Sequence, residues 1–150
     1  MKTAFLISSL NPGGAERVVS LLANEFVKNN EIIIITINNS VPFYDLDNNI
    51  KVISLKNYKD SNNILVGLLS NLKIIIKLLF IIRKYEIQRL ICFLVTSNVL
   101  GIIAGKLLNK RVIISERNNP YVRKLKYWDL ESHTRTLYVF ICCVQVTLHV

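Results

Sequence analysis

Short runs of aliphatic and β-branched residues alternate along the chain with longer segments in which apolar residues recur every three or four positions. The run "EIIIITI" at residues 31–37 is apolar on both faces of the strand that it predicts. Such a strand is typical of a parallel sheet covered by helices on both sides. The pattern predicts strands at residues 3–8, 31–37, 50–55, 89–94 and 111–115, a candidate last strand at 138–146, and helices at 15–28, 64–84 and 97–108.

This order of elements predicts the fold class. Strands that alternate with helices are joined by right-handed crossovers, so we expect an α/β fold with a Rossmann-like, doubly wound, mostly parallel sheet. Sheets of this class bind ligands beyond the carboxyl ends of their strands. Three segments of unusual chemistry leave those ends: "LNPGGAER" (10–17), "VTSN" (95–98) and "SERNNP" (115–120). We therefore expect the site where these segments meet.

The glycine turn in the first segment has two interpretations. The N–H groups of Gly13 and Gly14 can approach an anion closely, beside the positive end of the following helix. Alternatively, the glycines only supply positive φ angles in a sharp corner. The turn lacks the Gly-x-Gly-x-x-Gly fingerprint, and the one Gly-Lys pair, Gly105-Lys106, is followed by leucine. Dinucleotide and P-loop sites are therefore disfavoured.

Composition limits the class of protein, its partners and its cellular compartment. A chain of 150 residues with 51% hydrophobic residues is the size of one folded domain. The net charge of +9 fits either an anionic partner or a solvated basic surface, and its scattered distribution argues against nucleic acid. Cys92, Cys142 and Cys143 lack metal-ligand spacing, which predicts no metal and a reducing cytoplasm. The first apolar run breaks too early for a signal peptide.

Residues 64–82 are apolar over nearly the length of a membrane span, but Lys73 and Lys77 lie inside the segment. At helical spacing Ser70, Lys73, Lys77 and Lys84 share one narrow face. We predict a mostly buried helix with one hydrated face. Peripheral contact with an anionic membrane is the second interpretation.

The segments "FLISSLNPGGAERVVSLLANEF" (5–26) and "VIISERNNP" (112–120) resemble the N-terminal domain of the family 4 glycosyltransferases, two-domain GT-B enzymes of bacterial capsule, lipopolysaccharide and glycan assembly. The resemblance covers residues 2–130. It implies that a sugar moves from a nucleotide-sugar, expected to be a UDP-sugar, to a glycan or lipid-linked acceptor, with retention and without metal or other cofactor. The N-terminal domain would bind the acceptor, and a C-terminal domain would hold the donor.

The resemblance also implies roles for particular residues. Gly13 and Gly14 would approach the donor diphosphate, whereas the acceptor side would include Ser97, Asn98, Glu116, Arg117 and Asn118. Glu116 stands where many relatives have histidine; it would orient an acceptor hydroxyl as a candidate catalytic residue, or only pair with Arg117. Ser97 and Asn98 have the alternative of capping the next helix. Glu16 fits the helix dipole better than a substrate contact.

The resemblance ends near residue 130, so we expect a domain at 1–130 and a divergent tail at 131–150. The chain contains no two glutamates eight positions apart, a pair that the second domain of such enzymes carries. We interpret it as truncated or frameshifted, or as half of a split enzyme whose C-terminal domain is a separate chain. A non-catalytic remnant or binding module is the alternative. The expected location is the cytoplasm, at the inner face of the membrane. Two interpretations are open for Arg123, Lys124 and Lys126: they attract a phosphorylated lipid acceptor at that surface, or they lie on a solvated face, which we favour.

Overall fold

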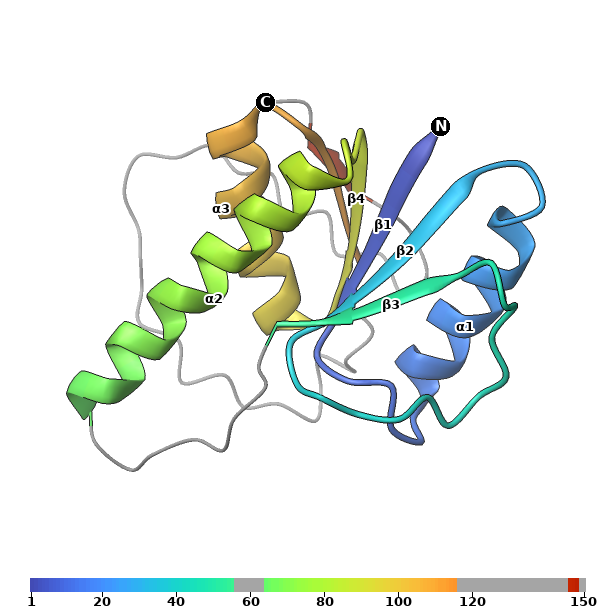
Figure 1. The fold of residues 1–150 in the computed structure, drawn as a ribbon, viewed down its shortest axis with the longest axis horizontal. Helices are drawn as coiled ribbons and strands as arrows, with labels where there is room; N and C mark the ends of the chain where they lie inside the picture. Colours follow the sequence, from blue (N-terminus) through green and yellow to red (C-terminus); the bar gives the residue numbers. More distant parts are fainter. Residues whose placement is uncertain (56–63, 116–145, 149–150) are drawn as a thin grey trace.

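The computed structural model describes residues 1–55, 64–115 and 146–148, which form one mixed sheet and three helices (Figure 1). In chain order the elements are β1 (Lys2–Ile7), α1 (Gly14–Phe26), β2 (Glu31–Thr36), β3 (Lys51–Ser54), α2 (Ile64–Lys84), β4 (Arg89–Phe93), α3 (Val95–Leu108), β5 (Arg111–Ser115) and β6 (Val146–Leu148). The strand order is β3-β2-β1-β4-β5-β6. Only β6 is antiparallel to its neighbour; the other described pairs are parallel.

The sheet is doubly wound, as the sequence predicted. From β1 the chain builds outward through β2 and β3, and α2 then carries it back across to β4 on the other side of β1. The order therefore reverses between β1 and β4, which is the position where sheets of this class bind ligands. Of the candidate last strand at 138–146, only Val146 lies among the described residues, where it begins β6.

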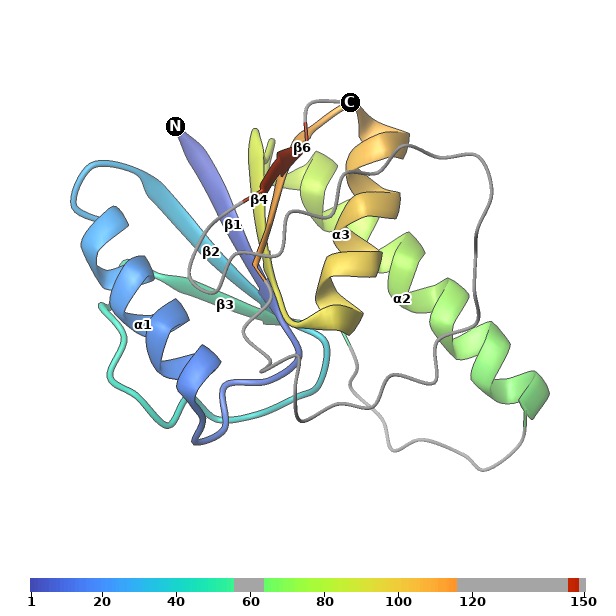
Figure 2. The same ribbon diagram turned by 180° about the vertical axis from the view of Figure 1, so that it is seen from behind.

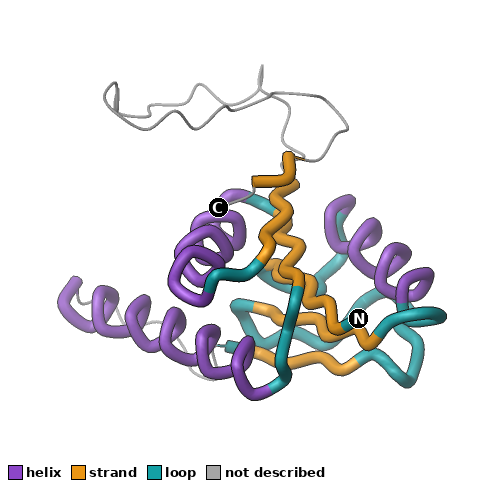
Figure 3. The backbone as a smooth tube through the Cα atoms, turned by 90° about the horizontal axis from the view of Figure 1, so that it is seen from above, coloured by secondary structure: helices purple, strands orange, loops and turns teal. Residues whose placement is uncertain are grey.

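Helices cover both faces of the sheet. Figures 1 and 2 show α1 on one side and both α2 and α3 on the other, and Figure 3 shows this layering from above. Side chains alternate along β1: Ala4 and Leu6 pack in the core beneath α2 and α3, whereas Phe5 and Ile7 pack beneath α1. The isoleucines of β2 are buried on both faces for the same reason.

Helix α3 lies unusually close to the sheet at two glycines. A Cβ atom added at Gly101 would meet Sγ of Cys92 on β4, and one at Gly105 would meet Val112 on β5. The same burial raises the pKa of the Cys92 thiol, which therefore stays protonated in the core. Both glycines are explained by close packing of the helix.

Helix α2 has the predicted bounds, but it is not buried outside one hydrated face: three of its described large apolar side chains are exposed, and its lysines do not share one environment. The Lys77 ammonium donates hydrogen bonds to the carbonyl oxygens of Ser54 and Leu55, at 2.8 and 2.9 Å. It thereby satisfies the end of β3, while Lys73 is exposed. That part of the prediction was wrong because a long lysine side chain reaches past the apolar contact to a neighbouring strand. No helix among the described residues could cross a membrane.

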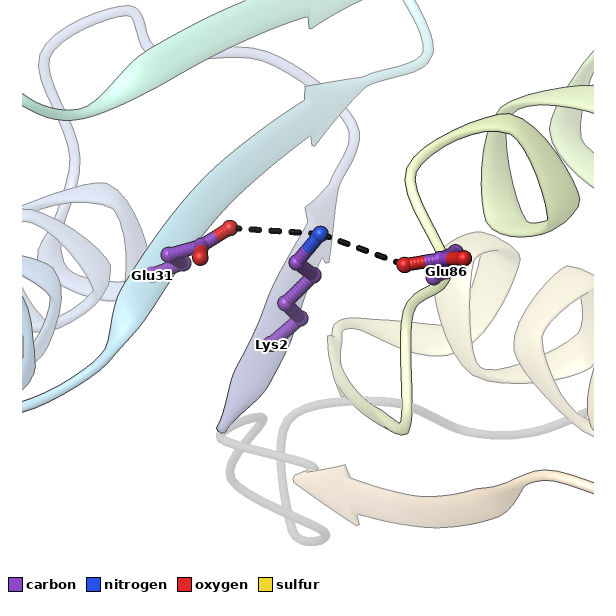
Figure 4. Close-up of polar contacts among 3 residues, drawn as sticks. All are labelled: Lys2, Glu31 and Glu86. Carbon is purple, nitrogen blue, oxygen red and sulfur yellow. Dashed lines mark hydrogen bonds and ion pairs between the residues drawn. The ribbon is translucent and has the colours of Figure 1, made fainter.

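At the amino ends of the strands, Lys2 links three segments of the chain (Figure 4). Its Nζ atom lies 3.4 Å from Oε2 of Glu86 and 3.6 Å from Oε2 of Glu31. The hydrogen bond that the Lys2 ammonium donates to Glu86, together with the negative charge of Glu31, raises the pKa of Lys2 above its usual value. Since both carboxylates are well exposed, these ion pairs contribute little to stability.

Candidate functional site

The ends of β4 and β5 are joined by hydrogen bonds at the carboxyl edge of the sheet. The backbone N–H of Leu94 donates to the carbonyl oxygen of Ser115 at 3.1 Å, and the Asn98 side-chain amide donates to the same oxygen at 3.4 Å. The segments "VTSN" and "SERNNP" therefore start side by side, as the sequence predicted. Glu116, Arg117 and Asn118, which directly follow Ser115, lie outside the described residues.

The interpretation of Ser97 and Asn98 as helix caps was wrong. Helix α3 begins at Val95, and its N-cap residue is Leu94, which makes no side-chain capping bond. Leu94 has a φ of 71°, so the chain turns from β4 directly into the helix without an intervening loop. Ser97 and Asn98 consequently lie inside the first turn of α3, where both are buried.

Two buried polar atoms at this end of α3 have no hydrogen-bond partner within the described part of the chain. They are Oγ of Ser97 and Oδ1 of Asn98. An unpaired buried polar atom costs free energy, so such atoms call for an explanation in a native protein. A hydroxyl and an amide oxygen can both hydrogen-bond to a polar ligand, and both residues follow the strand next to β1.

At the glycine turn, between β1 and α1, no glycine is required for a left-handed backbone. Gly13 is the N-cap of α1 with an extended backbone (φ −177°, ψ 163°), and no glycine of the described chain has a positive φ. The corner interpretation was therefore wrong. A Cβ atom at Gly14, the first residue of α1, would meet nothing within 4 Å. Neither the backbone conformation nor packing requires glycine at this position. The absence of a side chain leaves open space beside the N-terminus of the helix.

The Glu16 carboxylate lies over Gly13, where a Cβ atom added to that glycine would meet its Oε2 atom. This puts a negative charge at the positive end of α1, as expected from the helix dipole. No side chain caps this end of the helix with a hydrogen bond. An anion that approached the turn would therefore meet backbone N–H groups and also Glu16.

The loop between β2 and β3 holds the glycine turn from the side. Ser40 Oγ accepts a hydrogen bond from the Leu10 backbone N–H at 2.8 Å, and the Phe43 N–H donates to the Leu10 carbonyl at 3.0 Å. The Tyr44 hydroxyl donates to the Gly13 carbonyl at 3.2 Å. Sequence reasoning missed these contacts; the aromatic pair Phe43-Tyr44 inside a polar loop is the signal that could have found them.

We expect Tyr44→Phe to loosen the glycine turn without unfolding the domain. The ring keeps its edge-to-face contact with Phe43, whereas the hydroxyl bond to Gly13 is lost. The expected loss in unfolding free energy is about 1 kcal/mol. Urea unfolding measures this change, and amide hydrogen exchange of residues 13–17 measures the local effect. Equal exchange rates in the two proteins would show that the hydroxyl does not hold the turn.

A second polar region lies at the opposite, amino edge of the sheet. A cavity of about 320 Å³ there is lined by Met1, Gln88, Arg89, Asn109, Lys110 and Arg111. It lies at the far ends of β4 and β5 from the glycine turn and contains none of the predicted site residues. The structure gives no cluster of three or more potential metal ligands within its described ranges. The expectation that no metal is used stays a prediction.

Comparison with known proteins gives three likenesses. The family described as "Glycosyl transferase 4-like" matches residues 10–121. The GalNAc-α-(1→4)-GalNAc-α-(1→3)-diNAcBac-PP-undecaprenol α-1,4-N-acetyl-D-galactosaminyltransferase of Campylobacter jejuni is 35% identical over 128 residues, which are 85% of this chain and 35% of the relative. The apo structure of the lipopolysaccharide outer core galactosyltransferase WaaB has 23% identity and a TM-score of 0.52, over 77% of this chain and 32% of that one. At that identity the structural likeness supports the fold alone. The chain spans about a third of the length of both proteins.

Proposed function

Because the chain belongs to the Glycosyl transferase 4-like family, we propose that it forms the acceptor-binding half of a retaining glycosyltransferase that uses a nucleotide-sugar donor. The donor is a UDP-sugar, and the acceptor is a lipid-linked glycan of cell-surface polysaccharide synthesis at the cytoplasmic face of the membrane. A C-terminal domain, on the same or a separate chain, holds the nucleotide. The observation that carries this proposal is the open space at Gly14, over the uncapped N-terminus of α1.

That position suits the leaving group of the reaction. When the bond between sugar and diphosphate breaks, negative charge develops on the diphosphate, and fixed N–H dipoles stabilise it without reorganising. The amides that start α1 are such dipoles, and the helix N-terminus adds to their field. Because Gly14 has no side chain, phosphate oxygens can reach these amides. We propose that they supply the positive charge in place of a metal ion.

The acceptor side follows from the neighbouring strand. Asn98 joins α3 to Ser115, and we propose that the buried, unpaired atoms of Ser97 and Asn98 hydrogen-bond an acceptor hydroxyl that enters this end of α3. Glu116, Arg117 and Asn118 continue the chain from Ser115 and complete this side of the proposed site. The name of the Campylobacter jejuni relative specifies a glycan on undecaprenol diphosphate. We propose an acceptor of that chemical class, a glycan attached to a lipid diphosphate, for this chain.

Titration of the ¹⁵N-labelled chain with UDP-N-acetylgalactosamine, UDP-galactose and GDP-mannose tests the donor contact. We expect weak binding, with a Kd of about 1 mM or weaker, and amide shift changes concentrated at Gly13, Gly14 and Ala15. Gly14→Val fills the open space and is expected to abolish these changes.

Gly14→Ala is the matched smaller change. It adds one methyl group in open space, and alanine is the better helix former, so the unfolding free energy is expected to rise by up to about 1 kcal/mol while binding weakens. Weaker binding with higher stability is a combination that a structural defect does not give. Shift changes centred on Arg89 and Arg111, or none at about 10 mM donor, would contradict the proposal.

A further inference from the structure

The outer surface of the α2 and α3 layer carries two rows of exposed apolar side chains. On α2 the row is Leu72, Ile76 and Phe80, and on α3 it is Val99, Ile103 and Leu107. Each row repeats every four residues and so follows one face of its helix. The opposite faces bury Leu78 and Ala104 against the sheet, and the two helices contact each other (Figure 3). We call these six residues the α2–α3 face; exposed apolar patches of this kind mark binding surfaces.

Basic residues outnumber acidic ones in the part of the sequence that contains α2 and α3. Residues 61–115 contain eight lysines and arginines but one acidic residue, Glu86, whereas residues 1–60 contain six basic and six acidic residues. Neither α2 nor α3 contains an aspartate or glutamate. Four exposed basic residues border the apolar rows: Lys73, Arg83, Lys84 and Lys106. Apolar rows edged by cations alone complement a surface that is apolar inside and anionic at its boundary.

We propose that the α2–α3 face docks on an anionic lipid bilayer. The apolar rows enter the boundary between head groups and acyl chains, and the four bordering cations contact head-group phosphates, each adding to binding near such a surface. Lys77 takes no part, since its ammonium is bound to the carbonyls of Ser54 and Leu55. This inference rests on the proposed function in one respect: the lipid-linked acceptor that we propose is held at a bilayer surface.

Docking in this way puts the acceptor side of the site beside the bilayer. Helices α2 and α3 run back along the sheet, so their N-terminal ends lie at the carboxyl edge of the strands. Val99, the first member of the α3 row, directly follows Asn98 in the first turns of that helix. A glycan held at the bilayer by its lipid therefore needs to extend only a short way to reach Asn98.

Co-sedimentation of the full 150-residue chain with vesicles tests the proposal. One set is phosphatidylcholine alone, and the other is equal parts of phosphatidylcholine and phosphatidylglycerol. We expect sedimentation with the anionic vesicles and a decrease when salt is added, because surface charges are then screened. Lys73→Gln combined with Lys84→Gln is expected to weaken binding to the anionic vesicles. Equal sedimentation with both sets, or with neither, overturns the proposal.

Matched substitutions test which surface binds. Phe80→Gln and Leu107→Gln, at side chains that are each 62% exposed, are expected to lower the partition onto anionic vesicles by about tenfold each. Phe43→Gln in the β2–β3 loop and Leu21→Gln on α1 make the same changes at 62% and 60% exposure outside the α2–α3 face, and are expected to bind normally. Circular dichroism melting checks that all four variants fold.

Two outcomes of the matched series overturn the proposal. One is an equal loss of vesicle binding in the Phe43 and Leu21 variants. The other is a dimer, detected by light scattering, that Phe80→Gln disrupts, since the occupant of the face is then a second copy of the chain. The assay contains no nucleotide or acceptor, so its failure leaves the donor titration at the glycine turn unaffected. A failed titration likewise leaves the vesicle result standing.

Discussion

The 150-residue chain, purified by itself, is expected to transfer no detectable sugar. Holding two reactants in the correct geometry supplies several orders of magnitude in rate, and a GT-B enzyme does this between two domains. In the function that we propose, the described residues contribute one side of that site: the amides at the start of α1 for the diphosphate, and Ser97 and Asn98 for the acceptor. Mass spectrometry of mixtures of UDP-sugars with a glycan on undecaprenol diphosphate measures transfer.

Adding a donor-binding domain to the chain is the complementary experiment. If a separately expressed donor-binding domain restores transfer, the chain is half of a split enzyme; if no such domain is encoded nearby, the alternative of a non-catalytic remnant or binding module is favoured. Turnover by the chain alone that Gly14→Val abolishes would contradict the expectation and identify a complete enzyme. Inactive Gly14→Val should first be checked for folding, although a side chain at that position has open space.

The largest expected effect on stability is that of Leu78→Ala. Leu78 is fully buried at the centre of α2, in the core that also contains Leu6 and Ile35. Truncation leaves a cavity, and substitutions of this type cost about 2–5 kcal/mol, a large part of the stability of a small domain. Urea unfolding followed by circular dichroism measures the loss.

Leu72→Ala is the matched control for this change. It makes the same substitution on the same helix, at a side chain that is 53% exposed, and we expect a change in unfolding free energy below about 0.5 kcal/mol. Similar urea midpoints for the two variants would show that α2 does not pack on the sheet as described.

The sheet and its helices could be predicted because their signals are local. Strand β2 is apolar on both faces, so its sequence predicts a strand that is covered by helices on both sides. The length of the apolar, helix-spaced segment likewise predicted both ends of α2. The edge of the sheet at which we place the candidate site was inferred from the alternation of strands and helices alone. Residues 116–118, predicted on the acceptor side, stay predictions because they lie outside the described part of the chain.

The contacts that arrange the site could not be predicted in the same way. Leucine rarely adopts a positive φ, so nothing in the sequence placed the start of α3 at Val95 and buried Ser97 and Asn98. The bonds from Lys77 to the end of β3 and from Tyr44 to Gly13 join residues more than twenty positions apart. Such contacts depend on how separate elements pack against each other, and the periodicity of a single segment carries no information on that packing.

The position of Glu16 has a consequence for which anions can occupy the glycine turn. Its carboxylate lies beside Gly13 without a capping hydrogen bond, so it leaves the helix N–H groups free and adds a fixed negative charge next to them. An anion must therefore gain enough from the amides to offset this repulsion. An anion with a single acceptor atom, such as chloride, gains less than a diphosphate, whose several oxygens can accept from more than one N–H group. We therefore expect Glu16 to make the turn selective for anions with several acceptor oxygens.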